Sequence, residues 1–350
     1  VFPVGTQLVN TYTAKDGKSY DCPWDVVQPD DIAEGETGTT APAMVLQMHY
    51  ASLEDIQFSA YQAFYVVPEA GLVAGTYNVK FGLDWGTNVK NGTVYQFTLT
   101  KAAPAGARLT GFYNTSNTAP TGWKVYVYKD QQKSELLETC NVSAGDAGMN
   151  LGTFLAKPNG KLNGLYPVGY GDDRWWKSAY RQYLNSDLPA KQWWQPQDEW
   201  DMKPDQADTV PGFLAGFSDD FKNALTRVKV VTYGNTVIGD GSAVVTYDKI
   251  FLPSLEEIYC LPEASGEGNY WPYWKERTGA KTPQNPQNTY SLRITRDLAQ
   301  RTVGRNVRLR SAYRLHGNDV YYVNASGYVG PWSAVSEIRC APACKITTLG

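Results

Sequence analysis

LRSAYRLHGNDVYYVNASGYVGPWSAVSEIRCAPACKI, residues 309–346, is the stretch of sequence that decides the fold of the C-terminal half. Strand-forming residues at 320–323, and again from Tyr328 onward, flank the polar stretch Asn324-Ala325-Ser326-Gly327. A short segment with Asn and Gly between two such runs is typical of a β-hairpin turn. The stretch is also rich in Tyr, Trp, Ser, Gly and Asn, which make adaptable binding surfaces because rigid aromatics give contact area at low entropy cost. It therefore predicts a C-terminal hairpin, either an ordinary structural one or one that binds a partner.

Helices and further strands are predicted upstream of this hairpin. Asp172 or Asp173 can cap a helix that Pro189 ends, and its apolar positions follow a 3.6-residue period: Trp176, Ala179, Tyr180, Tyr183 and Leu184. A second helix is predicted at about 218–228, and the capping box Ser-Leu-Glu-Glu at 254–257 opens a third. Strands are predicted at 228–232 and 244–250. A few helices among short strands indicate an α+β domain.

The first region, residues 1–157, has a different pattern. Short runs of alternating apolar residues, such as 75–81 and 94–99, are broken by Gly, Pro, Asn and Asp. This pattern predicts an all-β, sandwich-like module. Pro and Gly near 102–106 suggest two subdomains, and Lys157-Pro158-Asn159-Gly160 suggests a linker to a second domain at 158–350. The chain is therefore predicted to be multidomain, with an N-terminal all-β part and a C-terminal α+β domain.

The composition describes a folded protein and excludes some classes of partner. Of 350 residues, 42% are hydrophobic and 19% are charged, as in globular proteins. The formal net charge of −3 gives no electrostatic basis for binding nucleic acid. There is no apolar run long enough to span a bilayer and no signal peptide, so we expect no membrane insertion. Because the sequence starts at Val1, whether a leader precedes it stays open.

The cysteines give no sign of a disulfide framework or a metal site. They are odd in number and sparse, so reduced thiols are expected at all five positions: Cys22, Cys140, Cys260, Cys340 and Cys344. Cys340 and Cys344 have the spacing of half a metal site, but no cluster of His or Cys partners accompanies them. Gln28-Pro29-Asp30 matches the sugar-selecting tripeptide of calcium-dependent lectins, yet no Trp-Asn-Asp segment exists to supply further ligands. We therefore predict neither a metal nor a cofactor.

A Trp-rich acidic segment at 193–201 is the main candidate for catalysis. Three tryptophans and three acids lie together in it: Trp193, Trp194, Trp200, Asp198, Glu199 and Asp201. Carboxylates beside tryptophans can form a glycosidase pair with sugar-stacking platforms. The competing interpretation is a loop fastened by buried tryptophans, and we favour it because no second, separate carboxylate can be paired with the segment. Motifs such as GxSxG, HExxH and the P-loop are also absent, so we predict that the protein is not an enzyme.

Three motifs, taken together, resemble one family. They are WWKSAYRQYLNS at 175–186, DKIFLPSLEE at 248–257, and the final stretch from Leu309-Arg310-Ser311 to Ala341-Pro342-Ala343-Cys344. They occur in the order seen in C-type-lectin-fold variable proteins of diversity-generating retroelements, which are found in gut phages and prophages. The resemblance covers roughly residue 164 to the end, about half the chain. It implies a C-type-lectin-like display domain at 158–350 with a variable segment at about 308–339.

In the resembling family, miscopied template adenines change Asn codons into codons for residues such as Tyr, His, Asp, Ser, Gly, Pro, Val and Arg. The resemblance thus implies these ligand-binding positions: Tyr313, His316, Asn318, Asp319, Tyr321, Tyr322, Tyr328, Gly330, Pro331, Trp332, Ser333, Val335, Ser336 and Glu337. Trp332 and Glu337 do not follow from Asn codons, so they are invariant or arise from another codon that contains adenine. The alternative is that the hairpin has a fixed sequence and that this chain is a relative of the family without a diversified segment. Four residues are expected to be scaffold: Trp176, Leu184, Leu252 and Arg310.

The resemblance also implies a function. It is that of an adhesin-like virion protein, encoded by a phage or prophage, that binds a receptor through a hypervariable surface. The implied partners are a bacterial surface protein or glycan, and other virion proteins held through the β-rich N-terminal module. A homotrimer would suit a fibre-like virion part. The implied location is the virion surface, on a tail or capsid, or the bacterial cell surface. A carbohydrate-active enzyme using residues 193–201 is the alternative.

Overall fold

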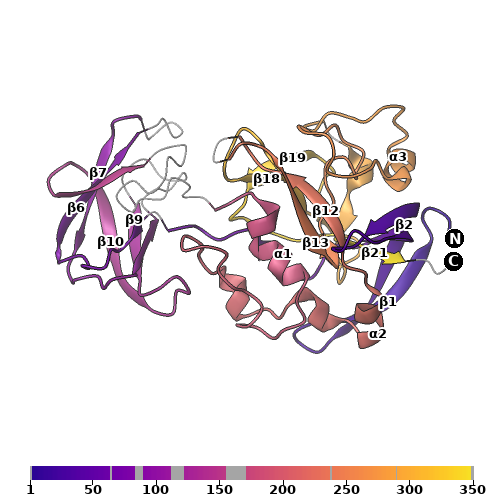
Figure 1. The fold of residues 1–350 in the computed structure, drawn as a ribbon, viewed down its shortest axis with the longest axis horizontal. Coiled ribbons are helices and arrows are strands. Elements are labelled where there is room, and N and C mark those ends of the chain that lie inside the picture. Colours follow the sequence, from indigo (N-terminus) through magenta and orange to yellow (C-terminus); the bar gives the residue numbers. More distant parts are fainter. Residues whose placement is uncertain are drawn as a thin grey trace. The chain divides into compact units, whose positions relative to one another are not determined.

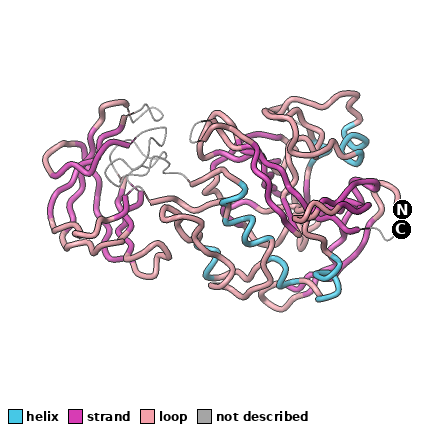
Figure 2. Tube along the Cα trace, in the orientation of Figure 1, coloured by secondary structure: helices cyan, strands magenta, loops and turns pink. Residues whose placement is uncertain are grey.

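The computed structural model describes residues 2–63, 65–82, 90–111, 122–154, 171–236, 239–288 and 290–347. These residues form several β-sheets and a few short helices (Figure 1). Strands and loops make up most of the trace (Figure 2). None of the helices in the described ranges has the length and apolar character needed to cross a bilayer.

The chain divides into two compact units. The first unit contains residues 1–58, 173–194 and 205–350, and the second contains residues 59–172 and 195–204. The predicted division into 1–157 and 158–350 is therefore wrong, because the first 58 residues belong with the C-terminal part. The predicted split near 102–106 is also wrong, since Ala103 forms a bridge with Leu72 within the second unit. The predicted linker at 157–160 lies outside the described residues.

The main sheet of the first unit joins the two ends of the chain. Its five antiparallel strands lie in the order β1-β2-β3-β21-β14, with these bounds: β1 (Gln7–Thr13), β2 (Ser19–Glu34), β3 (Thr40–Met48), β21 (Ala343–Thr347) and β14 (Ile250–Phe251). Ala343 lies opposite Gln47 and Thr347 lies opposite Ala43. Strands from both ends of the chain are thus side by side (Figure 1). This long-range pairing is why residues 1–58 cannot form a module with residues 59–157.

Smaller sheets and short helices complete the first unit. The strands are β4 (Ile56–Gln57), β12 (Val228–Tyr233), β13 (Ala243–Asp248), β15 (Thr295–Arg296), β16 (Gly304–Arg305), β17 (Val307–Ala312), β18 (Asp319–Val323), β19 (Val329–Ser333) and β20 (Glu337–Ile338). The helices are η1 (Trp175–Lys177), α1 (Ala179–Leu184), η2 (Asp205–Asp208), η3 (Phe213–Gly216), α2 (Asp219–Ala224), α3 (Pro272–Thr278) and η4 (Ser291–Arg293). The strands predicted at 228–232 and 244–250 are confirmed as β12, and as β13 with β14.

The first predicted helix starts later than expected. Ser178, not Asp172 or Asp173, is its N-cap, and its side chain accepts a hydrogen bond from the backbone N–H of Arg181 at 3.0 Å. The preceding turn is the 3-10 helix η1, which shifts the helical phase. As a result Trp175 is fully buried and Trp176 is only half-buried, so the scaffold role expected of Trp176 belongs to Trp175.

The capping box at 254–257 forms without opening a helix. Ser254 N–H donates to Glu257 Oε2 at 2.9 Å, and Glu257 N–H donates to Ser254 Oγ at 3.2 Å. One turn follows, and then Tyr259 takes the left-handed conformation with φ 64°. An L-residue in that conformation cannot continue a right-handed helix. The helix predicted at Ser218 does form, with Ser218 as its cap, and ends at Ala224.

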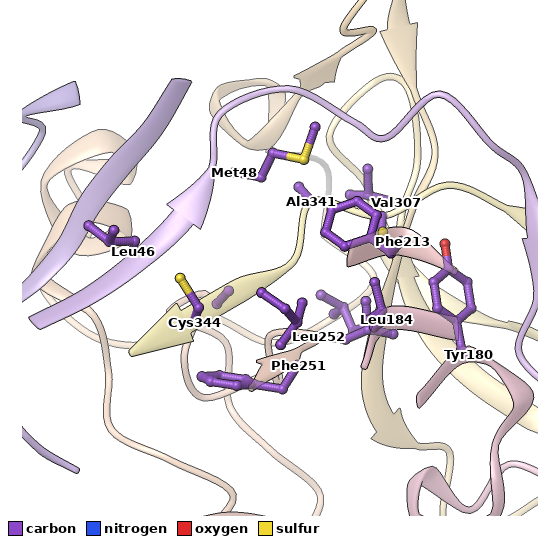
Figure 3. Close-up of a cluster of buried hydrophobic side chains, with 14 of the residues drawn as sticks. Leu46, Met48, Tyr180, Leu184, Phe213, Phe251, Leu252, Val307, Ala341 and Cys344 are labelled. Atoms are coloured by element: carbon purple, nitrogen blue, oxygen red, sulfur yellow. The ribbon is translucent and has the colours of Figure 1, made fainter. Parts of the chain in front are cut away.

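The hydrophobic core of the first unit draws on both ends of the chain. Figure 3 shows part of it, with these residues labelled: Leu46, Met48, Tyr180, Leu184, Phe213, Phe251, Leu252, Val307, Ala341 and Cys344. Leu184 and Leu252 are fully buried, which confirms their expected scaffold role. Burying a side chain of this size stabilises the fold by about 1.5–3 kcal/mol. The main sheet, α1 and the strand before the hairpin therefore fold as one body.

The described residues of the second unit form a β-sheet of seven strands. Their order is β11-β6-β7-β10-β9-β8-β5, with these bounds: β5 (Tyr65–Val66), β6 (Gly75–Phe81), β7 (Val94–Leu99), β8 (Arg108–Gly111), β9 (Lys124–Tyr128), β10 (Leu136–Ala144) and β11 (Met149–Phe154). Every second residue of β7 is buried, and Tyr95 lies 4.8 Å from Trp123, measured between ring centroids. This alternation is consistent with the sandwich that the sequence predicted for this region.

Candidate binding surface on the C-terminal hairpin

The predicted C-terminal hairpin is confirmed. Strands β17, β18 and β19 form a three-stranded antiparallel sheet, in which Val320 lies opposite Trp332 and Val323 lies opposite Val329. In the turn, Asn324 Oδ1 accepts hydrogen bonds from the backbone N–H groups of Ser326 and Tyr328, each at 2.9 Å.

Buried Arg308 fixes the hairpin from β17. Its guanidinium donates to four carbonyl oxygens at 2.9–3.1 Å: those of Val320, Trp332, Ser333 and Ser336. Burial lowers the pKa of Arg308 to about 10, so the group still carries its charge at neutral pH. One side chain thus ties together β18, β19 and the turn that follows.

Arg310, two residues further along β17, holds the base of the hairpin. It is 1% exposed, forms an ion pair with Glu257, and donates to the carbonyl oxygen of Leu252 at 2.7 Å. Its Nη2 also donates to Glu257 Oε1 at 3.0 Å. A buried charge is tolerated only when paired and hydrogen-bonded in this way. The expected scaffold role of Arg310 is confirmed.

An aromatic cluster lies on one side of the hairpin. Trp332 is 54% exposed, and its ring centroid lies 6.1 Å from that of half-buried Tyr322. Half-buried Tyr328 lies over Gly330, where an added Cβ would be 2.5 Å from the Tyr328 ring. Trp332 is thus the exposed member of this cluster, and two partly exposed tyrosines lie beside it. These residues make the centre of a surface that can bind a partner.

A second cluster lies at the turn between β17 and β18. The rings of Tyr313 and His316 are 4.8 Å apart in an edge-on arrangement, and His316 Nδ1 lies 2.6 Å from Asp319 Oδ2. Leu315, which is 66% exposed, is a surface residue that the sequence prediction missed. Its position in a turn just before Gly317 was the available signal.

Most of the predicted ligand-binding residues reach the surface, but three do not. His316, Trp332 and Glu337 are exposed, and these eight are half-buried: Tyr313, Asn318, Asp319, Tyr322, Tyr328, Pro331, Ser333 and Ser336. Tyr321, Gly330 and Val335 are buried, so the prediction that they bind ligand is corrected. Tyr321 faces inward because strand neighbours alternate between faces, and its hydroxyl donates to Glu263 at 2.8 Å.

The Trp-rich segment is fastened as the sequence suggested. Trp193, Trp194 and Trp200 are all buried. Asp198 Oδ1 accepts the backbone N–H groups of Trp200 at 2.9 Å and Asp201 at 3.1 Å. Asp201 Oδ2 accepts the N–H of Gln197 at 2.7 Å. In these contacts the carboxylates hold the turn of the loop itself.

The five cysteines form no disulfide with one another in the described part of the chain, and all five are buried. Burial raises the pKa of Cys340 to about 11, which keeps the thiol protonated. Among the described residues, no group of three or more His, Cys, Asp or Glu side chains is placed to hold a metal ion.

A cavity of about 560 Å³ lies beside α1, α2 and β13. Several charged side chains in its lining pair with one another: Arg181 Nε lies 2.7 Å from Asp248 Oδ1, and Lys222 Nζ lies 2.8 Å from Asp219 Oδ1. Arg181 and Lys222 are therefore each held by an acidic side chain of the same lining.

The fold and this surface define a β-rich protein of several sheets that presents an aromatic hairpin on a rigid base. The chain belongs to the family described as "Domain of unknown function (DUF6273)", which matches residues 153–348, more than half of its length. The matched range contains the hairpin, α1 and β21. No curated protein and no solved structure matches the chain.

Proposed function

We propose that the protein binds a bacterial surface protein or glycan through the hairpin, as a display protein of a phage or prophage virion. The domain that carries the hairpin is proposed to be a C-type-lectin-like domain. The support comes from the three motifs that resemble variable proteins of diversity-generating retroelements, and from the hairpin surface. No metal ion, cofactor or catalytic step is part of this proposal.

One observation carries the proposal: exposed Trp332 and two partly exposed tyrosines lie on a backbone that buried arginines hold in place. Trp332 is 54% exposed, while the carbonyl oxygen of the same residue is held by Arg308 at 3.0 Å. Side chains on such a backbone can vary without loss of the fold, because surface changes away from caps and cores shift stability by about 0.5 kcal/mol or less. A few aromatic anchors can nevertheless contribute about 2 kcal/mol or more each to binding.

The test is a binding measurement with the double variant Trp332→Ser/Tyr322→Ser. Immobilised protein is exposed to surface extracts of candidate host bacteria, and bound material is quantified. We expect binding to fall about thirtyfold or more, with the unfolding midpoint close to wild type. Tyr126→Ser, at an exposed tyrosine of β9, is the matched control. Loss of binding in the control but not in the double variant would contradict the proposal.

The variable character of the segment has a separate test in the neighbouring DNA. We expect a reverse-transcriptase gene and a near-copy of the coding region for residues 309–344. The copy should differ from the gene chiefly at adenines. A locus without these two elements would point to a fixed hairpin, although the binding role would still be tested by the variants.

Attachment to the virion is proposed to use β-rich parts outside the hairpin, and a homotrimer is the proposed assembly. Light scattering coupled to size-exclusion chromatography measures the assembly directly. A monomer at all concentrations would contradict the trimer, and it would leave the hairpin proposal to its own test.

A further inference from the structure

A second cavity, of about 80 Å³, lies in the first unit beside α3, and five separate segments build it. Its buried lining includes Asp25 from β2, 4% exposed, and Gln47 from β3, 6% exposed. Its exposed lining includes Arg277 of α3 and Arg296 of β15. His49, just after β3, also lines the cavity.

The Asp25 carboxylate accepts hydrogen bonds from three side chains. Its Oδ2 accepts from His49 Nδ1 at 2.7 Å and from the Tyr273 hydroxyl at 2.8 Å, and its Oδ1 accepts from Gln7 Nε2 at 2.9 Å. Burial, and then the charge of Asp25, raise the pKa of Tyr273, so its hydroxyl stays protonated and donates. Since His49 uses Nδ1 on Asp25, its Nε2 is left without a hydrogen-bond partner within the described part of the chain.

The two guanidinium groups differ in how they are held. Arg277 lies over the ring of Tyr273 at 5.3 Å and donates to the Tyr273 hydroxyl at 3.1 Å, so its position is fixed. The Arg296 side chain forms no hydrogen bond or ion pair with the residues that the structure describes. Two guanidinium groups against one carboxylate leave the lining with a net charge of +1 when His49 is neutral.

We propose that this cavity is a binding site for a single carboxylate group, carried by a small organic acid or by the end of a peptide. Arginine binds carboxylates through two parallel N–H···O bonds, which gives both affinity and orientation. A monoanion neutralises the lining, whereas a phosphate dianion would meet the buried charge of Asp25. A cavity of about 80 Å³ has room for a carboxylate group. The site uses none of the hairpin residues, so it is independent of the proposed function.

The two histidines of the chain make a direct test. The full-length protein, labelled with ¹⁵N in histidine, is titrated with sodium acetate at fixed pH, with sodium chloride at matched ionic strength as reference. We expect acetate to shift the His49 ring signals saturably and to leave those of His316, on the hairpin, unchanged. A His49→Gln variant assigns the signals. No saturable shift, or the same shift with chloride, overturns the proposal.

Replacing individual charged residues shows which side chains contribute to acetate binding. Arg296→Ala and Arg277→Ala should each weaken acetate binding about tenfold, because each removes a charge-assisted contact. Lys275→Ala removes a positive charge from the same helix without altering the lining and should change binding less than twofold. An unchanged His316 signal and thermal midpoint show that each variant is folded. Equal binding by Arg296→Ala and wild type, or tighter binding of inorganic phosphate than of acetate, rejects the carboxylate site.

The source of the carboxylate is distinguished with trialanine and its C-terminal amide. If a peptide end is the natural group, trialanine binds more tightly than acetate and the amide does not bind. If a small acid is the natural group, acetate binds more tightly than trialanine. Binding of the amide as tightly as trialanine contradicts the site, because the amide lacks the carboxylate.

Discussion

Trp175 and Trp176 are neighbours in sequence, but they contribute differently to the free energy of unfolding. Trp175 is fully buried and its indole N–H donates to Asp248 Oδ2 at 3.1 Å, whereas Trp176 is half-buried. Trp175→Ala should therefore destabilise the fold by about 3–5 kcal/mol, through the lost contacts and the cavity left behind. Trp176→Ala serves as the matched comparison and should cost clearly less. Chemical denaturation of both variants measures this difference, and equal midpoints would show that the helical phase is wrong.

Glu267 is a buried carboxyl whose protonation is coupled to folding. Burial raises its pKa to about 7 from 4.5, although Arg310 opposes the shift. The folded state therefore binds the proton more tightly than the unfolded state does. The resulting stability is present below about pH 4.5 and is lost as the pH rises through 7. The loss should be on the order of 3 kcal/mol.

Glu267→Gln isolates this effect. A glutamine can still accept from the Tyr233 N–H, which Glu267 Oε1 does at 2.9 Å, and can donate to Ser311. We expect the wild type to lose stability relative to the variant between pH 4.5 and pH 7. Denaturant titrations of both proteins across this range provide the measurement. Parallel pH profiles would mean that Glu267 titrates as an ordinary carboxyl.

At the scale of the element, the hairpin contains two positions, Tyr328 and Gly330, at which the effects of substitutions on stability should depend on each other. A Cβ at Gly330 would lie 2.5 Å from the Tyr328 ring, so Gly330→Ala forces that ring to move. We expect Gly330→Ala to cost about 1–3 kcal/mol. The cost should largely disappear in the background of Tyr328→Ser, which removes the ring. A double-mutant cycle measures the coupling, and additive effects would show that the two positions are independent.

Individual helices, strands and turns could be predicted only where the residues that determine them are close in sequence. The helix start at Ser218 and the Asn324 turn depend on neighbours within four residues, and both were predicted. The burial of Tyr321 was also predictable, because Tyr321 and Tyr322 alternate along β18 and cannot share a face. In contrast, the burial of Trp175 depends on a 3-10 turn that periodicity does not reveal.

At the scale of the whole molecule, the matched family range is incomplete as a folding unit. Residues 153–348 lack β3, which pairs with β21 in the main sheet. A chain limited to residues 153–348 should therefore fail to give the dispersed amide NMR spectrum of a folded protein. Addition of a peptide with residues 1–58 should restore dispersion, because it supplies the missing strands. A well-dispersed spectrum from residues 153–348 alone would contradict this prediction.

Long-range strand pairing also limited how much of the two candidate binding sites could be predicted from the sequence. The strand character of β3 and β21 depends on local residues, but their partnership joins residues almost three hundred positions apart. The same is true of the carboxylate cavity, where Asp25 and Arg277 meet although nothing in the sequence relates them. The hairpin surface could be predicted from the sequence because one continuous segment forms most of it.

The pairing of β3 with β21 has a consequence for synthesis on the ribosome. β3 ends at Met48 and β21 ends at Thr347, so at about 5–20 residues per second the partner strand emerges roughly 15–60 s later. During that interval the nascent main sheet has an open edge, which can pair with other chains. Residues 59–172 emerge in between and carry the strands described for the second unit, β5 to β11. We therefore expect that unit to begin folding first during translation, and the first unit to need protection from aggregation until the last strand is made.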